Sequence, residues 1–262
     1  MHQPARKLRE TIAAGRAVIG TMMVEFGGPA TVGVTADAGF DFMVLDGEHG
    51  HANPRELEAT IESGYQNGIC TILRPPNVDR GMITRSLDAG AGGVLIPFCS
   101  TLEEVHQAVR TTKYTPVGQR GVHLLRGHTR HRRHDPTTFM AEANRDLLTI
   151  IQIELASAVG LVEKIAAIDG VDGLYIGPGD LSVDLGVPGQ WSAPPVMDAI
   201  RRTADACQAQ GKIMGCHFDR VADFPLLRQQ GVQMFGFFCD IGMYQMAAQN
   251  VMSEFRGVVG KQ

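Results

Sequence analysis

Short apolar runs recur along the whole chain, at spacings typical of a protein in which strands and helices alternate. Eight of these runs have the length and the aliphatic, aromatic and β-branched content expected of buried strands. They span residues 17–24, 40–46, 70–75, 93–98, 147–154, 173–180, 212–218 and 234–240. The pattern therefore predicts eight strands, spread from one end of the sequence to the other.

The stretches between these runs have the pattern of amphipathic helices, because apolar residues recur three and four positions apart and charges occupy other positions. The clearest cover residues 54–68, 101–114, 156–170 and 195–211. Several stretches close with a glycine just before the next strand, and glycine there supplies the left-handed conformation that ends a helix. These glycines are Gly39, Gly68, Gly90, Gly170, Gly211 and Gly231.

Eight such strand-helix units in 262 residues match the number and size of the units in a (β/α)8 TIM barrel. The alternative is a doubly wound open sheet, which rarely contains eight such regular units. No GxGxxG motif follows the first predicted strand, as it would in a dinucleotide-binding sheet of that kind. We therefore expect an α/β protein with a single TIM-barrel domain over residues 1–262.

The composition is that of an ordinary globular protein, with 44% hydrophobic residues, 20% charged residues and a net charge of −4. We expect no nucleic acid as a main partner. No apolar run approaches the roughly eighteen residues of a membrane span, and the N-terminus has no apolar signal core, so no membrane partner is expected. The five cysteines are odd in number and lack CxxC spacing, which predicts free thiols and a cytoplasmic location.

Polar residues gather where the predicted strands end, which is where a TIM barrel carries its catalytic groups. The stretch FMVLDGEHGH, residues 42–51, is the clearest case. The candidates are Asp46, Glu48 and His49 after the second run, Arg74 in the third, Gln152 and Glu154 in the fifth, and Asp180 in the sixth. His51 is expected to be peripheral. Because the same runs carry almost no other charge, the pattern indicates an active site at the barrel mouth.

Glu154 and Asp180 are the candidate metal ligands. Each ends an apolar run, and a carboxylate near a core requires a compensating charge. Two carboxylates with open positions suit Mg²⁺ or Mn²⁺, which keep several waters. The alternative is a salt bridge to an arginine such as Arg74.

The turn IGPGDLS, residues 176–182, predicts the start of a helix. The Gly179 and Asp180 amides at this start could hold a substrate carboxylate, although the same sequence also fits a plain tight turn.

His49 and Arg74 are the candidates for proton transfer and for charge stabilisation. His49 is flanked by glycines at a strand end, which favours a general base at the mouth over a histidine buried in the core. Arg74 leaves a buried strand at the same edge, where a fixed cation can stabilise an enolate or alkoxide oxygen. Asp46 could position His49 or a water, or it could support the strand end.

The segment RGHTRHRRHD, residues 126–135, is strongly basic. Charge runs are usually a solvated face. The functional alternative is a cationic lid over the barrel mouth that favours an acidic substrate.

The motifs at these positions together resemble the HpcH/HpaI aldolase family, the metal-dependent pyruvate aldolases, whose barrels are of the phosphoenolpyruvate/pyruvate-domain type. The resemblance covers nearly the whole chain and is carried by AGFDFMVLDGEHG, LRPP, LDAGAGGVLIP, TPVGQRGV, IIQIE and GVDGLYIGPGDLSVDLG. It implies Glu154 and Asp180 as ligands of Mg²⁺, Mn²⁺ or Co²⁺. It also implies that Gln152 and the Gly179 and Asp180 amides hold pyruvate, and that Asp46 lines the substrate site.

The same resemblance implies His49 as the base, Arg74 as the transition-state stabiliser, and Asp88 as a residue that raises the basicity of His49. Asp88 precedes the fourth predicted strand, so it lies at the opposite face of its own barrel and could reach His49 only from a neighbouring subunit. The resemblance therefore implies a homo-oligomer, a trimer or hexamer, with shared active sites. This chain departs from the family in HLLRGHTRHRRHD after QRGV, and in GPGDLS where the family usually has GPADLS.

The expected activity is reversible aldol cleavage of a 4-hydroxy-2-oxo acid into pyruvate or hydroxypyruvate and an aldehyde. The alternatives are an acyl-CoA lyase of the citrate lyase β type, an oxaloacetate decarboxylase, and a non-catalytic barrel that binds oxo acids. No lysine stands at the carboxyl end of a predicted strand, so we expect no Schiff base with the substrate.

Overall fold

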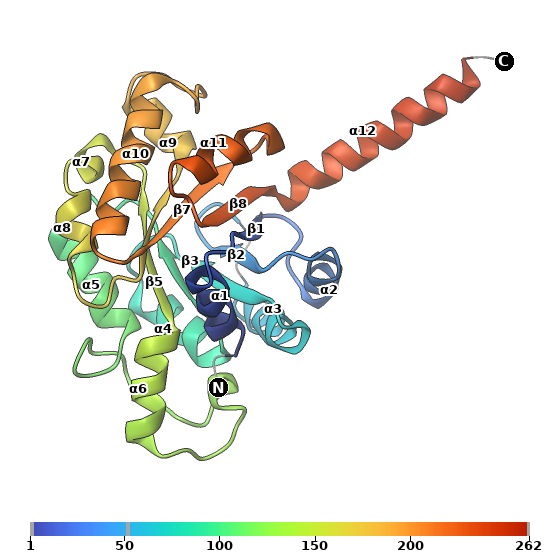
Figure 1. Cartoon of the computed structure of the whole chain (residues 1–262). Helices are drawn as coiled ribbons and strands as arrows, with labels where there is room; N and C mark the ends of the chain where they lie inside the picture. Colours follow the sequence, from blue (N-terminus) through green and yellow to red (C-terminus); the bar gives the residue numbers. More distant parts are fainter. Residues whose placement is uncertain (1–2, 51–52, 261–262) are drawn as a thin grey trace.

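The chain forms a closed barrel of eight parallel strands, as the sequence pattern predicts (Figure 1). The structure is a computed structural model that describes residues 3–50 and 53–260. The strands are paired in chain order, and β8 returns to β1 to close the sheet. Their bounds are β1 Val18–Met23, β2 Phe42–Asp46, β3 Cys70–Arg74, β4 Gly93–Ile96, β5 Leu148–Ile153, β6 Gly173–Ile176, β7 Ile213–Phe218 and β8 Met234–Cys239.

Most of the helices follow strands and form the outer layer; α1 precedes the first strand, and α12 projects away from the barrel (Figure 1). Their bounds are α1 Gln3–Ala13, α2 Pro29–Asp37, α3 Pro54–Asn67, α4 Arg80–Ala89, α5 Leu102–Thr112, α6 Pro136–Asp146, α7 Ala156–Val159, α8 Val162–Ala166, α9 Pro178–Asp184, α10 Pro194–Ala209, α11 Phe224–Gln229 and α12 Asp240–Val259, with short 3-10 turns η1 Gly127–Thr129 and η2 Val221–Asp223. Two predictions need correction: the helix expected over 156–170 is split into α7 and α8, and the sixth strand ends at Ile176. Proline at 178 explains the second difference, because it favours the start of a helix.

The six glycines expected to end helices all have positive φ, between 62° and 116°. This confirms the repeated turn from helix into strand. Such turns bring each new strand in at the same end of the barrel, the floor, so the carboxyl ends of all strands meet at the mouth.

Two apolar layers hold this arrangement. One fills the barrel interior with side chains such as Phe42, Ile72, Ile150 and Tyr175, and α1 closes the floor by adding Leu8 to this layer. The other lies between the outer faces of the strands and the surrounding helices. The five cysteines are free, as predicted, and four of them are buried. In the described part of the chain, no helix has the length and apolar character needed to cross a membrane.

Candidate active site

The structure brings most of the predicted site residues together at the mouth. Asp46 ends β2, Arg74 ends β3, Glu154 directly follows β5, and Gln152 lies two residues before it. Asp46 and Arg74 are direct neighbours in the register of β2 and β3. Strand order and register therefore place these side chains on one edge.

Arg74 is held by a two-pronged ion pair. Its Nε donates to Asp46 Oδ1 at 2.9 Å and its Nη2 to Asp46 Oδ2 at 2.7 Å. Both residues are buried, at 6% and 5% exposure. Burial opposes the charge of Arg74, but the hydrogen bonds and the negative charge of Asp46 raise the pKa of the guanidinium above its ordinary value. Arg74 is therefore a permanent cation in a fixed orientation.

Asp46 also shapes the turn that carries His49. The same Oδ1 accepts hydrogen bonds from the backbone amides of Glu48, at 3.0 Å, and His49, at 3.3 Å. His49 is exposed at this edge. The histidine is thus accessible at the mouth, as the sequence suggests, and its base role stays a prediction. His51 lies outside the described residues.

Glu154 is a deeply buried residue of the site, at 2% exposure. Its Oε1 accepts a hydrogen bond of 2.6 Å from Gln152 Nε2, and its Oε2 accepts one of 3.2 Å from the backbone amide of Phe98. A Cβ added at Gly177 would stand 2.5 Å from Glu154 Oε1 and 2.7 Å from Gln152 Nε2. Only glycine at 177 leaves room for this pair.

The clustered carboxylates of the site favour binding of a cation. Burial raises the pKa of Glu154 to about 8; the Phe98 amide and Arg74 oppose this rise, whereas the charges of Glu48 and Asp180 add to it. Burial also raises the pKa of Glu48, although Arg74 opposes that rise. Glu48 Oε2 lies 3.3 Å from Arg74 Nε, yet it makes no hydrogen bond among the described residues. Clustered carboxylates with an unsatisfied oxygen fit a divalent ion, which would offset their mutual repulsion.

Asp180 lies on the first turn of α9 rather than on β6, and it is exposed at the mouth. Gly179 lies in the same first turn, where backbone amides have no partner within the helix. Within residues 3–50 and 53–260, no group of three or more His, Cys, Asp or Glu side chains is arranged to hold a metal. The two carboxylates predicted as metal ligands, Glu154 and Asp180, would leave the other positions of an ion to water or substrate.

Asp88 lies apart from this cluster, as the sequence predicts. It stands in the last turn of α4, at the floor, and its Oδ1 accepts a 2.6 Å hydrogen bond from Arg120 Nη2. Its backbone carbonyl lies 2.8 Å from Nδ1 of His128. Within one chain Asp88 thus belongs to a buried polar cluster at the floor, far from the mouth.

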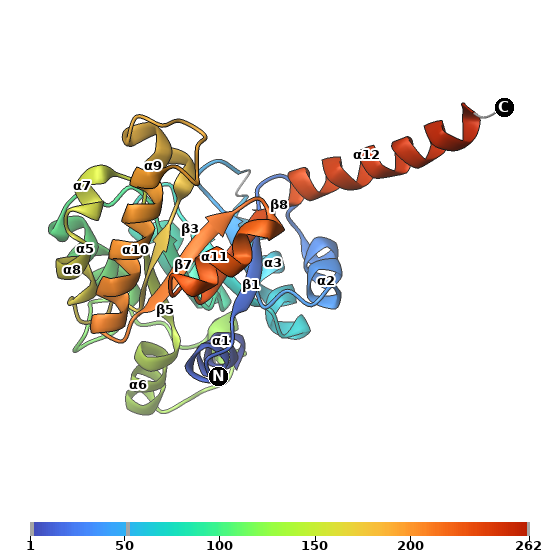
Figure 2. The same cartoon turned by 45° about the horizontal axis from the view of Figure 1, so that its top comes forward.

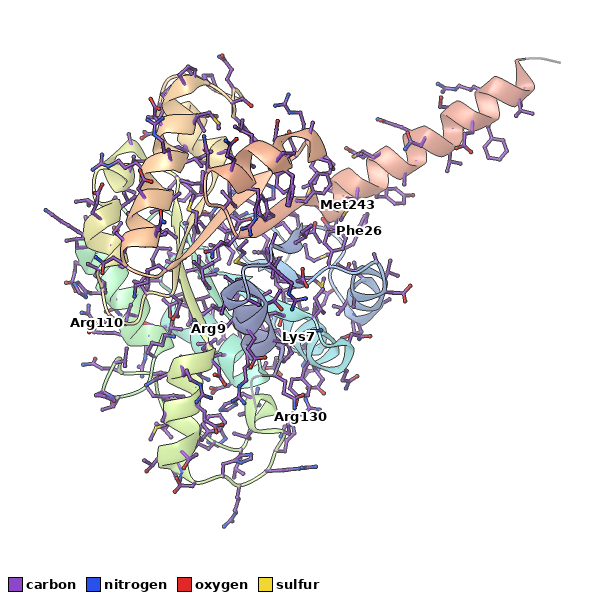
Figure 3. The ribbon with its side chains drawn as sticks, in the orientation of Figure 1. Lys7, Arg9, Phe26, Arg110, Arg130 and Met243 are labelled. Carbon is purple, nitrogen blue, oxygen red and sulfur yellow. The ribbon has the colours of Figure 1, made fainter. Side chains whose placement is uncertain are left out.

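The alternative of a cationic lid is wrong for the chain's own barrel. The basic segment leads into α6 and packs on the outside of α3 and α4. Arg126 pairs with Glu58 at 2.8 Å, and Arg130 pairs with Glu62 and covers the ring of Tyr65. Arg130 lies at the floor end of the molecule in Figure 3. A connection that leads from a helix into a strand lies at the floor, because the strands begin there. The charge pattern alone does not show whether a segment lies at the floor or at the mouth.

The sequence assigns no specific role to three polar groups at the mouth or just below it. Glu48 stands there only as one of the polar residues at a strand end, and the other two are Tyr175 and His217. Tyr175 and His217 are polar residues inside apolar strands, β6 and β7. That signal was readable in the sequence, but the face to which each side chain points requires the strand register.

Comparisons with known proteins identify the family and agree with the fold. The family model described as HpcH/HpaI aldolase/citrate lyase matches residues 22–245. The chain is 32% identical over 250 residues to a 5-keto-4-deoxy-D-glucarate aldolase of Escherichia coli O139:H28, covering 95% of this chain and 96% of that one.

Two solved structures share the architecture. One is an HpcH/HpaI aldolase from Desulfitobacterium hafniense DCB-2, with a TM-score of 0.90, 31% identity, and coverage of 95% of this chain and 96% of that one. The other is the citrate synthase SbnG, with a TM-score of 0.84, 28% identity, and coverage of 95% and 98%.

Proposed function

Because this chain belongs to the HpcH/HpaI aldolase/citrate lyase family, we propose that it is a metal-dependent pyruvate aldolase. The reaction is the reversible cleavage of a 4-hydroxy-2-oxo acid into pyruvate or hydroxypyruvate and an aldehyde. The observation that carries the proposal is the mouth cluster: Asp46 fixes the guanidinium of Arg74, the charge of Arg74 acts on the buried carboxylate of Glu154, and His49 is exposed just after β2.

Each group has a role that its surroundings support. Gln152 and the first-turn amides at Gly179 and Asp180 hold the pyruvate carboxylate. In cleavage, His49 removes the proton from the 4-hydroxyl group as the C3–C4 bond breaks, and Arg74 stabilises the negative charge of the resulting enolate. Glu154 and Asp180 would hold Mg²⁺, Mn²⁺ or Co²⁺, and such an ion supplies Lewis-acid polarisation of the 2-oxo group when it is bound.

Lysine chemistry is disfavoured by the positions of the amines. Lys113 Nζ is buried at the floor, where it donates to the backbone oxygens of Asn144 and Leu147 and pairs with Asp172. Lys212 donates to Val171 O, also at the floor. Lys7 lies on α1 and Lys164 on α8, so no lysine of the described chain stands at the mouth. Borohydride with pyruvate should therefore leave the mass and activity of the protein unchanged.

The activity is tested with metal-reconstituted protein, by measuring pyruvate release from a panel of 4-hydroxy-2-oxo acids and from oxaloacetate, and by measuring consumption of acyl-CoA esters. We expect turnover of the hydroxy-oxo acids. Glu154→Ala and Asp180→Ala should each abolish both turnover and Mn²⁺ binding measured by calorimetry, with the melting temperature retained. Turnover of only CoA esters or oxaloacetate, or binding without turnover, would point to the alternative functions.

A homo-oligomer with shared sites is part of the proposal, and α12 supports it. This helix leaves the barrel at its mouth end and projects away in both views (Figures 1 and 2). Only Asp240 and Gly242 of it are buried, while Tyr244, Val251 and Phe255 are among its exposed apolar side chains. A helix with this composition requires an apolar surface to pack on.

The first turn fixes the direction of α12. The Asp240 carboxylate accepts hydrogen bonds from the amides of Val24, Glu25 and Phe26, the last at 2.6 Å. Tyr244 then packs edge-on against Phe26, with ring centroids 5.6 Å apart. Since these contacts hold α12 away from its own barrel, we propose that it packs on a second copy of the chain. The same association could bring Asp88 of one copy to His49 of another.

The cellular location completes the proposal. The five free cysteines support a reducing compartment, the cytoplasm.

A further inference from the structure

His217 is a polar residue on the inner face of the barrel, one residue before the end of β7. Its direction follows from Gly215 on the same strand, where an added Cβ would collide with the ring of Tyr175, a residue of the interior layer. Side chains two positions apart on a strand point to the same face. Because Gly215 is level with Tyr175 in the register, His217 lies nearer the mouth than the Tyr175 backbone.

One ring nitrogen of His217 is enclosed and unsatisfied. Nδ1 has no hydrogen-bond partner among the described residues, and a Cβ at Gly236 of β8 would stand 3.1 Å from it. The Tyr175 hydroxyl borders the same glycine and makes no hydrogen bond of ordinary geometry within the described structure. We assign the hydrogen to Nε2, because a bare Nδ1 matches the donor character of the neighbouring phenol.

The His217 ring is neutral, and Trp191 packs against it. Enclosure and the charge of Arg74 lower the pKa of His217 to about 4. Trp191 meets the imidazole edge-on, with ring centroids 6.2 Å apart. Arg220, in the loop after β7, donates a 3.0 Å hydrogen bond to Ser192, which ties this loop to the segment that carries Trp191. A neutral donor is thus fixed in the wall of the mouth, on the strand next to β6 and the α9 turn.

We propose that His217 is a specificity-determining residue, whose Nε2–H donates a hydrogen bond to a hydroxyl group on the aldehyde half of the substrate. This rests on the proposed aldol reaction and adds the substrate class, a hydroxyaldehyde rather than an unsubstituted aliphatic aldehyde. An aldehyde without that hydroxyl would leave the enclosed imidazole unpaired, and sites built to bind a hydroxyl discriminate strongly against analogues that lack it. Tyr175 acts as a positioning residue through the imidazole.

The test compares kcat/KM for aldol addition of pyruvate to D-glyceraldehyde and to propanal, which has the same carbon chain without hydroxyls. His217→Leu should lower kcat/KM for glyceraldehyde by about tenfold and leave propanal within about twofold. His217→Asn should recover part of the loss, because its amide can donate. Tyr175→Phe should raise KM for glyceraldehyde with little change in kcat. His106→Leu, at an exposed position on α5, is the matched control.

Two results would overturn the assignment: equal losses with both aldehydes, which would make His217 structural, or no loss with either. Failure of the aldol proposal itself is distinguishable, because the parent protein would then turn over neither aldehyde, and the role of His217 would fail with it.

Discussion

Asp46 is the residue on which the local order of the mouth depends. One buried carboxylate accepts two hydrogen bonds from Arg74 and two from the turn that carries His49. All of these donors converge on two oxygens, so a single side chain positions the guanidinium relative to the turn that carries His49. Asp46 therefore organises the groups proposed to act, and its predicted contact with substrate stays a prediction.

Replacing Arg74 by lysine should lower turnover by on the order of a hundredfold, because a single ammonium on a flexible stem cannot reproduce the planar fork held by Asp46. The measurement is kcat for aldol cleavage, with the melting temperature as a check on folding. Arg202→Lys is a suitable control, since Arg202 also binds a carboxylate with two nitrogens, but on the exposed surface. A loss of no more than about threefold would make Arg74 structural.

His128 should make the protein sensitive to mild acid. Burial and the nearby Arg120 lower the pKa of His128 to about 4. Between pH 6.5 and 4 the unfolded chain therefore takes up a proton that the folded chain refuses, so unfolding becomes easier as the pH falls. We expect the free energy of unfolding to drop by on the order of 2 kcal/mol from pH 7 to pH 5 through this group.

Denaturant unfolding at several pH values checks this. His128→Phe keeps an aromatic ring against Phe139, which His128 contacts edge-on, and it should flatten the pH dependence. The dependence should shrink rather than vanish, because His217 has a pKa lowered in the same way. The exposed His106→Gln should change nothing, and an unaltered slope in His128→Phe would refute the assignment.

At the scale of elements, the turn from β6 into α9 affects the positions of both candidate metal ligands. Gly177 has no side chain and so leaves room for Glu154. Helix α9 then begins at Pro178 and carries Asp180 in its first turn. The predicted strand over 173–180 combined these parts, although the chain changes from strand to helix between them. The change of element allows carboxylates from β5 and α9 to face the same space.

Gly177→Ala should weaken Mn²⁺ binding at least tenfold, because the added methyl group would stand 2.5 Å from Glu154 Oε1 and displace that carboxylate. Calorimetry measures the binding, and the melting temperature monitors the fold. Gly179→Ala is the matched control, since a Cβ at 179 meets no atom within 4 Å and should leave the affinity for the ion alone. Equal affinities for both variants and the parent would separate Glu154 from the metal.

At the scale of the whole molecule, helices cover the outside of the barrel except beside α12. No described helix lies over β1 and β8 between α11 and α2 in Figure 2, and Ile19 of β1 is 39% exposed. Seven strands are followed by helices that return to the barrel, and the eighth is followed by one that does not. This asymmetry is the physical reason to expect more than one copy in the functional protein.

Val251→Glu combined with Phe255→Glu should convert the protein to a smaller species in light scattering, because the two side chains lie four residues apart on one face of α12. The charges could not be buried against a second copy. Glu254→Gln is the control on the same helix. If Asp88 acts across subunits, turnover should fall with the loss of assembly; an unchanged mass in the double variant would contradict the role of α12.

The barrel could be predicted from the sequence because its causes are local. Apolar runs, amphipathic stretches and helix-ending glycines each follow from the preferences of neighbouring residues, and their number and order specify the topology. Strand ends likewise identified Arg74 and Glu154, since parallel strands of a barrel bring their carboxyl ends to one edge. The order of elements also placed Asp88 at the floor.

Other features were decided only by contacts between distant parts of the chain. The pairing of Asp46 with Arg74 depends on strand register, and the inward direction of His217 depends on glycines in β7 and β8 that make room for Tyr175. The surface that the basic segment covers depends on Glu58 and Glu62 of α3, which pair with Arg126 and Arg130. The course of α12 is set by backbone amides more than 200 positions earlier. Local preferences carry no information about such partners, so only the folded structure could assign them.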